Sequence, residues 1–317
     1  MTGVRPVLVA TNLDDPTADI VIKELHLRGV PVTRFDSADF PADLTLSAHM
    51  GTGRRWQGRL GTPTRTVRLE AVRSLYYRRP TGFAFPSLNQ QDARFAVLQA
   101  RYGLGGVLAS LPECVYVNHP NRIGDAEYKP AQLAAAIDVG LAVPATLITS
   151  DPDAARAFIK ERGPVVHKPL AVTPYLVDGA LSTVMVEEVD PQDIDDTVGG
   201  TAHLFQSRVD KVADMRVTVV GSRVFCARID SDLLDWRTDF SRLTYAVVEP
   251  PSGMEPALHA FLRRFGLVFG AFDFAVGLDG SWTFLECNPS GQWAWLEDHT
   301  GLPITGAVAD LLQRGST

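Results

Sequence analysis

The sequence has 317 residues, of which 45% are hydrophobic and 21% charged, so it can bury the cores of two or three domains or closely packed subdomains. The 37 acidic and 30 basic residues give a formal net charge of −7, which provides no general attraction for a nucleic-acid backbone. Cys114, Cys226 and Cys287 have neither the spacing of a disulfide framework nor that of a zinc site. Because no signal peptide and no apolar stretch of membrane length is visible, we expect a cytoplasmic protein without a membrane or nucleic-acid partner.

The first region opens with the β-α-β pattern of a parallel sheet. Residues 4–10 read as a buried strand, the apolar spacing of residues 16–28 predicts a helix, and residues 30–35 predict a second strand. The glycine fingerprint of a dinucleotide site is missing from this unit. The region is completed by several short strands over residues 43–78, a helix at about 91–110 and a strand near 114–118.

Two turn clusters suggest the domain boundaries. Asn118-His119-Pro120-Asn121 and Gly199-Gly200 divide the chain into residues 1–118, 119–200 and 201–317. The second part is predicted to contain helices at 129–139, 151–162 and near 191–197, and strands at 143–149, 164–168 and near 182–188. The third part is predicted to contain strands near 202–206, 212–220, 223–230, 268–278 and 281–288, and helices near 253–265 and 303–314.

Two acidic residues are predicted to face each other in a hairpin near the C-terminus. Asp279-Gly280 between two apolar runs is a strong hairpin signal. If these two residues form the turn, Asp273 lies directly opposite Glu286, and a four-residue turn over residues 277–280 would make the two acids diagonal neighbours. Only a turn of odd length would separate them. The alternation of side chains along a strand places Asn288 on the same face as Glu286.

This arrangement of acids predicts a magnesium site. Facing carboxylates repel each other in a sheet, and the surrounding aromatic residues raise that cost because a buried charge needs compensation. Carboxylate and amide oxygens suit Mg²⁺, so Asp273, Glu286 and Asn288 are the candidate ligands. Zinc is disfavoured because histidine and cysteine partners are absent, although Cys287 lies between two candidate ligands on the opposite face. The alternative is that both acids are solvated strand residues.

Five basic residues could complement a metal-bound polyphosphate. Lys168 ends a buried strand, where it either snorkels to solvent or points at a ligand, and Lys129 begins a helix, where the helix dipole disfavours positive charge. Arg216 and Arg228 lie in neighbouring apolar strands, and Arg237 lies in a loop. The alternative for each arginine is a structural ion pair.

In their order along the chain, these residues resemble the ATP-grasp family. The resemblance covers about residues 115–317, and the preceding α/β region resembles the pre-ATP-grasp domain that accompanies this fold. It implies an α/β protein with an α+β lid. The residues that carry the resemblance are Lys129, Lys168, Leu204-Phe205-Gln206, Asp214-Met215-Arg216, and Asp273 with Glu286-Cys287-Asn288.

The resemblance also implies a role for each matching position. Lys129 and Lys168 would contact the phosphates of ATP, and Gln206, Ser207 and Val209 would form the hinge that reads adenine. Asp214 would lie near the ribose. The γ-phosphate and then the acyl phosphate would be bound by Arg216, Arg228 and Arg237, and Mg²⁺ by Asp273, Glu286 and Asn288. One departure is that the lid stretch, residues 171–181, contains only one glycine, Gly179.

Within the ATP-grasp enzymes, the chain resembles the graspetide, or microviridin-type, peptide maturases, and especially their actinobacterial branch. The phrases that carry this resemblance are Tyr76-Tyr77-Arg78-Arg79-Pro80, Ala126-Glu127-Tyr128-Lys129-Pro130, Thr146-Leu147-Ile148-Thr149 and Leu234-Asp235-Trp236-Arg237. Such enzymes join side chains of a ribosomal precursor peptide by ester or amide bonds, guided by a leader segment. The resemblance implies ATP and Mg²⁺ as cofactors and a precursor peptide as partner. Arg78 and Arg79 are candidate peptide contacts, with solvated arginines as the alternative, and a homodimer is compatible with this family.

The sequence thus favours an ADP-forming carboxylate ligase that works through an acyl phosphate. The first alternative is an amino-acid ligase of the ribosomal-modification or glutathione-synthetase type, which shares the nucleotide chemistry but uses another acceptor. The second alternative is an ATP-grasp module that binds nucleotide without turnover.

Overall fold

The N-terminal part is built on a four-stranded parallel sheet, as its β-α-β opening predicts. A computed structural model describes residues 4–52, 55–171, 175–177, 180–182 and 184–314 of the protein. The sheet has the order β2-β1-β6-β7. Its strands are β1 (Val7–Ala10), β2 (Val32–Phe35), β6 (Ser74–Tyr77) and β7 (Val115–Val117).

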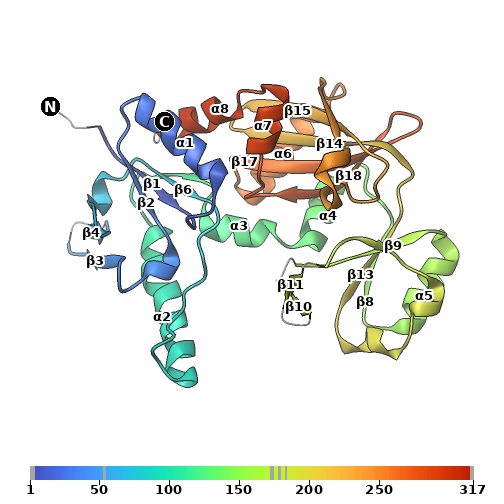
Figure 1. Ribbon diagram of the computed structural model, residues 1–317, viewed down its shortest axis with the longest axis horizontal. Coiled ribbons are helices and arrows are strands. Elements are labelled where there is room, and N and C mark those ends of the chain that lie inside the picture. The colour runs from blue at the N-terminus through green and yellow to red at the C-terminus, as the bar shows by residue number, and fades with distance from the viewer. Residues whose placement is uncertain (1–3, 53–54, 172–174, 178–179, 183, 315–317) are drawn as a thin grey trace.

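Helices cover both faces of this sheet. α1 (Pro16–Leu27) packs on one face together with the C-terminal helix α8 (Ile304–Arg314), so the two ends of the chain share a core. α2 (Gln90–Leu108) packs its last turns on the other face and projects from the body (Figure 1). The predicted short strands form a separate antiparallel sheet of β3 (Thr45–His49), β4 (Gln57–Gly61) and β5 (Thr66–Arg68).

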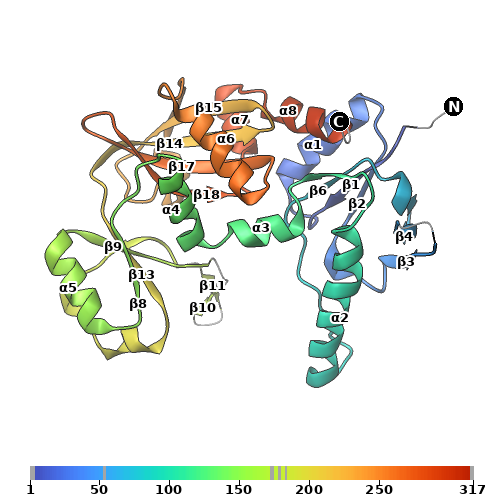
Figure 2. The same cartoon turned by 180° about the vertical axis from the view of Figure 1, so that it is seen from behind.

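The central part is a small antiparallel sheet reached through two helices, α3 (Pro120–Ala126) and α4 (Lys129–Asp138) (Figure 2). The sheet has the order β12-β9-β13-β8 and is covered by α5 (Pro152–Arg162). Its strands are β8 (Thr146–Thr149), β9 (Val165–Lys168), β12 (Glu187–Glu188) and β13 (His203–Ser207). A hairpin of β10 (Tyr175–Val177) and β11 (Ala180–Ser182) follows β9, and the glycine-poor lid stretch lies partly outside the described residues.

The C-terminal part is a five-stranded antiparallel sheet of the order β16-β15-β14-β17-β18. One face packs on α6 (Met254–Phe265) and α4, and the other continues into the core shared by α1 and α8. Its strands are β14 (Lys211–Val220), β15 (Arg223–Asp230), β16 (Thr244–Val247), β17 (Phe269–Gly277) and β18 (Trp282–Asn288). β16 and α7 (Ala294–Thr300) have no counterpart in the sequence prediction.

Two further predictions differ from the structure. The helix expected near residues 191–197 is not formed. Two 3-10 turns, Pro191–Asp193 and Asp196–Gly200, take its place. Each turn begins at an aspartate cap, and the second cap interrupts the segment before an α-helix can form. The turn cluster at residue 118 is followed directly by α3, whose first residue is Pro120. Other 3-10 turns lie at Ser37–Asp39, Leu69–Ala71, Trp236–Thr238 and Phe240–Arg242.

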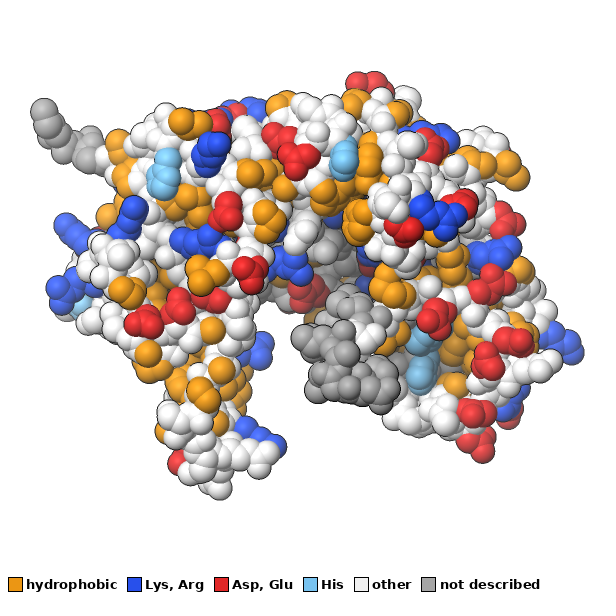
Figure 3. Space-filling model, viewed as in Figure 1, with side chains coloured by type: hydrophobic (Ala, Val, Ile, Leu, Met, Phe, Trp, Pro, Cys, Tyr) orange, Lys and Arg blue, Asp and Glu red, His pale blue; other side chains and the backbone are white. Residues whose placement is uncertain are grey.

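The central sheet and α2 flank an open hollow in one face of the molecule (Figure 3). Charged side chains of both signs gather at the floor of this hollow. Among the described residues, no helix combines the length and apolar character required to cross a bilayer.

Candidate active site

The turn of the β17–β18 hairpin differs from both predicted lengths. The Gly277 N–H donates to the Ser281 carbonyl at 2.9 Å, and the Gly280 N–H donates to the Gly277 carbonyl at 3.0 Å. The loop therefore consists of Leu278, Asp279 and Gly280, and Gly280 adopts a φ of 80° that favours glycine. A turn of odd length alone would place the two acids on opposite faces of the sheet.

A β-bulge nevertheless restores the predicted pairing of Asp273 with Glu286. Phe274 pairs with Phe284, whereas Asp273 pairs with Glu286, so Leu285 is an extra residue in β18. The bulge shifts the register by one residue, which returns Glu286 to the face that carries Asp273. The prediction that these acids face each other is confirmed, although the turn that was expected to produce it is wrong.

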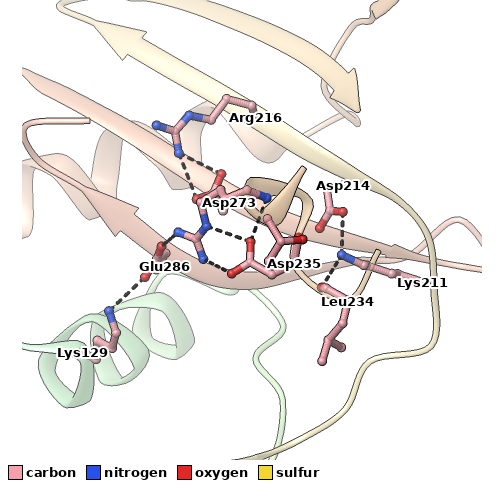
Figure 4. A network of polar contacts seen from close by, with 10 residues as sticks. Lys129, Lys211, Asp214, Arg216, Leu234, Asp235, Asp273 and Glu286 are labelled. Carbon is pink, nitrogen blue, oxygen red and sulfur yellow. Dashed lines mark hydrogen bonds and ion pairs between the residues drawn. The ribbon is translucent and has the colours of Figure 1, made fainter. Parts of the chain in front are cut away.

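Arg216 neutralises Asp273 from the neighbouring strand. Arg216 in β14 is the register partner of Asp273 in β17, and its Nη1 donates to both carboxylate oxygens at 2.8 and 2.9 Å (Figure 4). Both side chains are only 6% exposed. Arg216 Nη2 also donates to the Gln292 carbonyl at 3.1 Å, which ties this ion pair to the loop after β18.

Two other cations hold Glu286. Lys129 Nζ, from the first residue of α4, donates to Oε2 at 3.0 Å, and Arg237 Nη1 donates to Oε1 at 2.7 Å (Figure 4). Burial alone would raise the pKa of Glu286, but Lys129 and Arg237 hold it well below its usual range. Burial raises the pKa of Asp273 against the opposing effect of Arg216. Glu286 is therefore the more firmly ionised member of the acid pair.

A cavity of about 350 Å³ opens above this acid pair, between the central and C-terminal sheets. It combines an apolar side with a strongly charged side, a combination that suits a ligand with a flat apolar ring and an anionic tail. The apolar side includes Val166, Val184, Met185, Val186, Ala275 and Leu285. The polar lining residues include Lys129, Lys168, Gln206, Ser207, Lys211, Asp214, Asp235, Arg237, Asp273 and Glu286, and Val209 lines the cavity next to them.

Lys168 lies at the end of a short buried polar chain. Its Nζ donates to Gln206 Oε1 at 2.7 Å, and Gln206 Nε2 donates to Thr146 Oγ1 at 2.9 Å. Gln206 is 2% exposed, and its carboxamide fixes the lysine at the cavity wall. Burial lowers the pKa of Lys168 to about 8, and the charges of Arg237 and Lys129 act in the same direction against that of Glu286.

This pKa predicts that anionic nucleotides bind more weakly as the pH rises. The ammonium form of Lys168 is lost between about pH 7 and pH 9, and a phosphate gains more from the charged form, so the affinity should fall by up to about tenfold per pH unit above pH 8. Calorimetric titration with a non-hydrolysable ATP analogue across this range measures the effect. Lys168→Met should remove the dependence; an unchanged pH profile in that variant would assign it to another group.

Asp214 and Lys211 form a second pair at the cavity wall. Lys211 Nζ donates to Asp214 Oδ2 at 2.6 Å and to the Leu234 carbonyl at 2.9 Å. Burial raises the pKa of Asp214 to about 6, although Lys211 opposes that shift. Lys211 was not identified from the sequence, because a lysine that begins a strand carries no distinguishing signal.

Arg228 and Asn288 lie outside the cavity wall. Arg228 Nε donates to Asp230 Oδ1 at 2.8 Å within β15, so the structural ion pair considered as an alternative is the one observed. Asn288 is the register partner of Ala271, two residues from Asp273 along β17, and its Oδ1 accepts from the Ser290 N–H at 2.9 Å. Asn288 is therefore near the acid pair and exposed at the end of the hairpin.

The prediction that Arg78 contacts a peptide does not fit the structure. Its side chain is 1% exposed and donates to Asp15 at 3.1 Å and to the Gly291 carbonyl at 3.1 Å, so it ties the N-terminal sheet to the loop after β18. The next residue, Arg79, is exposed and remains available to a partner. Sequence alone could not separate the two, because both arginines directly follow the same strand.

Arg78→Met is therefore expected to destabilise the fold rather than weaken a surface contact. Removing one member of a buried ion pair costs about 3–5 kcal/mol, because Asp15 is left without its counter-charge. Arg79→Ala is the matched control and should change the free energy of unfolding by less than about 0.5 kcal/mol. Urea denaturation of both variants measures this difference. Equal free energies of unfolding for the two variants would contradict a structural role of Arg78.

Comparison with known proteins supports the class that the sequence suggests. Residues 6–124 match the family model of the MvdD pre-ATP grasp domain. Two similar solved structures are a ribosomal-peptide-associated ATP-grasp ligase of Chryseobacterium gregarium in complex with ADP and a leader and core peptide, and the macrocyclase MdnC of Microcystis aeruginosa bound with precursor peptide MdnA. The first is 27% identical over 97% of this chain and 96% of that chain with a TM-score of 0.89, and the second is 26% identical over 98% and 100% with a TM-score of 0.88.

A third similar structure is the macrocyclase MdnB of Microcystis aeruginosa, which is 28% identical over 97% of this chain and 99% of that chain with a TM-score of 0.83. The search of curated proteins gave no match. The fold, with its charged cleft between two antiparallel sheets, is that of the ATP-grasp ligases. Residues 6–124 carry the MvdD type of pre-ATP-grasp domain, and the whole chain is similar to ATP-grasp ligases associated with ribosomal peptides, the resemblance that its sequence suggests. Its placement in the actinobacterial branch stays a prediction.

Proposed function

We propose that the protein is a cytoplasmic ATP-dependent ligase that forms ester or amide cross-links between side chains of a ribosomal precursor peptide recognised with its leader. The observation that supports this most is the acid pair Asp273–Glu286, which lies in a cleft between cations from three different elements. An Asp or Glu carboxylate of the peptide attacks the γ-phosphate of ATP, which gives an acyl phosphate and ADP. A Ser or Thr hydroxyl or a Lys amine then attacks the acyl carbon and expels phosphate.

The residues present fit a magnesium ion. Asp273 and Glu286 offer carboxylate oxygens on one face of the sheet, and Asn288 offers an amide oxygen next to them, which is a donor set of the hard type that Mg²⁺ prefers. Each carboxylate oxygen accepts one hydrogen bond from a cation and keeps a further lone pair. When bound, Mg²⁺ would neutralise charge on the transferred phosphoryl group.

The nucleotide is assigned to the cavity from the chemistry of its walls. We assign the phosphates to Lys129 and Lys168, adenine to the hinge residues Gln206, Ser207 and Val209, and the ribose to Asp214. Because the carboxamide of Gln206 already bonds Lys168 and Thr146, the hinge would read adenine through its backbone and leave that side chain to fix the lysine.

Arg216 and Arg237 are assigned to the phosphoryl group in transfer. Both guanidinium groups already point at the acid pair, so each could stabilise charge that develops on phosphate oxygens without reorganising. Arg228 is left out because it pairs with Asp230 and, unlike Arg216 and Arg237, forms no hydrogen bond with the acid pair. A closed cleft would also keep water from the acyl phosphate.

The domain division and the assembly belong to the same proposal. We propose a pre-ATP-grasp domain at residues 1–118, a lid subdomain at 119–200 and a C-terminal subdomain at 201–317. Arg79, which is exposed beyond the end of β6, is the proposed peptide contact of the first domain, and a homodimer is the proposed assembly.

The test is intact-mass analysis of candidate precursor peptides incubated with the enzyme, ATP and Mg²⁺. We expect the peptide to lose the mass of one water for each bond formed, with ADP released in equal amount. A gain in peptide mass would instead identify an amino-acid ligase. Nucleotide binding without ADP release for any candidate peptide would favour a binding module.

A further inference from the structure

Asp235 is a buried acid that the proposed chemistry does not yet use. It precedes the 3-10 turn Trp236–Thr238, and its Oδ1 accepts from the Arg237 backbone N–H at 3.1 Å. The same oxygen accepts from Arg237 Nε at 2.9 Å, and Oδ2 accepts from Arg237 Nη2 at 3.0 Å. Asp235 is 7% exposed, whereas the Arg237 side chain is 41% exposed, so the acid side of this charge-assisted two-point contact is buried.

This two-point contact between Asp235 and Arg237, called the fork below, determines which edge of the Arg237 guanidinium faces the cleft. Asp235 occupies the Nε–Nη2 edge of Arg237, which leaves Nη1 as the nitrogen that reaches Glu286 at 2.7 Å. Burial alone would lower the pKa of Arg237, but Asp235 and Glu286 raise it, so the group stays charged. A single N–H edge is thereby presented toward the acid pair.

The backbone that carries Asp235 is held from both sides. Lys211 Nζ donates to the carbonyl of Leu234, which directly precedes Asp235. Trp236 is 6% exposed and packs against Trp295 and Phe240, with ring centroids 5.2 and 5.8 Å apart. The backbone of Asp235 is therefore held in place, so its carboxylate keeps the Arg237 guanidinium in a defined orientation.

The charge of Asp235 argues against a role in holding the nucleotide. A carboxylate in the wall of a cleft that takes a polyphosphate repels that ligand and weakens ground-state binding. Both carboxylate oxygens of Asp235 accept from Arg237, so its contribution falls on that arginine. Orientation of a charged group that acts on the phosphoryl in transfer is such a contribution, since misplacement by about 1 Å can slow a reaction by about 100-fold.

We propose that Asp235 is a positioning residue, which fixes Arg237 so that Nη1 meets the phosphoryl group as it passes from ATP to the peptide carboxylate. This inference rests on the proposed function. It adds a residue whose effect falls on the rate of transfer and not on nucleotide affinity.

The test compares Asp235→Asn with Asp239→Asn. Asparagine retains the oxygen that caps the turn but cannot accept from Nη2, so the turn remains and the fork is lost. Asp239 caps the neighbouring turn by accepting from the Ser241 N–H at 3.0 Å and is not among the residues that line the cavity, which makes it the matched control. For Asp235→Asn we expect kcat to fall by about 10- to 100-fold with the KM for ATP unchanged or lowered, and for Asp239→Asn we expect neither to change by more than about twofold.

A second background shows whether Asp235 acts through Arg237. Lysine cannot form the two-point contact, so in Arg237→Lys the further change Asp235→Asn should have less than about a threefold effect on kcat. An equal loss of kcat in both backgrounds would overturn the inference, as would a raised KM with kcat unchanged.

The nuclear magnetic resonance signal of the Arg237 Nη2 protons, which donate to the oxygen that asparagine lacks, gives a readout that needs no peptide. It should be protected from solvent exchange in the wild type and in Asp239→Asn and be lost in Asp235→Asn, with Arg237→Lys providing the assignment. If the signal behaves in this way while no peptide is ever cross-linked, the proposed function fails and the positioning of Arg237 stands. An unchanged signal in Asp235→Asn would overturn the positioning itself.

Discussion

Asp273→Asn and Glu286→Gln are each expected to lose peptide cross-linking by at least about a thousandfold. Both should still fold, although Asp273→Asn should be less stable than the wild type because buried Arg216 loses its counter-charge. Each substitution retains an oxygen for the neighbouring cation but removes the charge that would hold a divalent metal against the nucleotide. Intact-mass analysis of the peptide, with circular dichroism of the variants, measures both parts of this prediction.

The matched control for these variants is Asp279→Asn. Asp279 lies in the turn of the same hairpin and accepts from the Ser281 N–H at 3.0 Å, but it is exposed and distant from the cavity wall. It should retain wild-type activity. Normal turnover in Asp273→Asn or Glu286→Gln would refute the metal assignment. Loss of activity in Asp279→Asn would show that replacing any acidic residue of the hairpin lowers the activity.

Arg216→Met is expected to destabilise the protein by about 3–5 kcal/mol and to abolish transfer. The variant leaves Asp273, which is 4% exposed, without its counter-charge, and a buried charge without a partner is strongly unfavourable. The double variant Arg216→Met with Asp273→Asn removes both charges and should recover much of the stability but none of the activity. Denaturation in urea measures the recovery.

Arg223→Met is the control for loss of an arginine from the same sheet. Arg223 pairs with Asp310 at the surface, where the two side chains are 43% and 29% exposed, so its loss should change the stability by less than about 1 kcal/mol. If Arg216→Met proved no more destabilising than Arg223→Met, the ion pair with Asp273 would not be a structural element of the sheet.

The sequence predicts the main elements of the fold because their periodicity is strong. The β-α-β opening, the antiparallel strands of the C-terminal sheet and the helix that begins at Lys129 all follow from the spacing of apolar residues. Short elements were missed or misread. β16 has only four residues, and the segment at 191–197 has aspartate caps that favour separate 3-10 turns over one helix.

The acid pair shows how a correct prediction can rest on an incorrect detail. A two-residue turn was expected from Asp279-Gly280, yet the loop also includes Leu278, and the pairing of Asp273 with Glu286 survives through the bulge at Leu285. Burial of Phe284 and Cys287 on one face favours the bulge, because it directs both side chains into the core against α6. No local pattern in the sequence predicts this combination of a three-residue loop and a bulge.

Long-range ion pairs were the least predictable part of the site. Arg78, Arg79, Arg216 and Arg228 all lie in or beside apolar strands, and only the fold decides which of them meets a buried acid. Asp235 offered one usable signal, since an acid two residues before Arg237 in a loop is well placed to form a fork with it. Lys211 offered none.

The most direct test of the central claim is electron paramagnetic resonance of Mn²⁺, used in place of Mg²⁺, in the presence of a non-hydrolysable ATP analogue. The wild type should bind the metal with the nucleotide, and Glu286→Gln should leave the metal as the free nucleotide complex at the same concentrations, while Asp279→Asn behaves as the wild type. Equal metal binding by the wild type and Glu286→Gln would contradict the assignment of the acid pair to the metal–nucleotide complex.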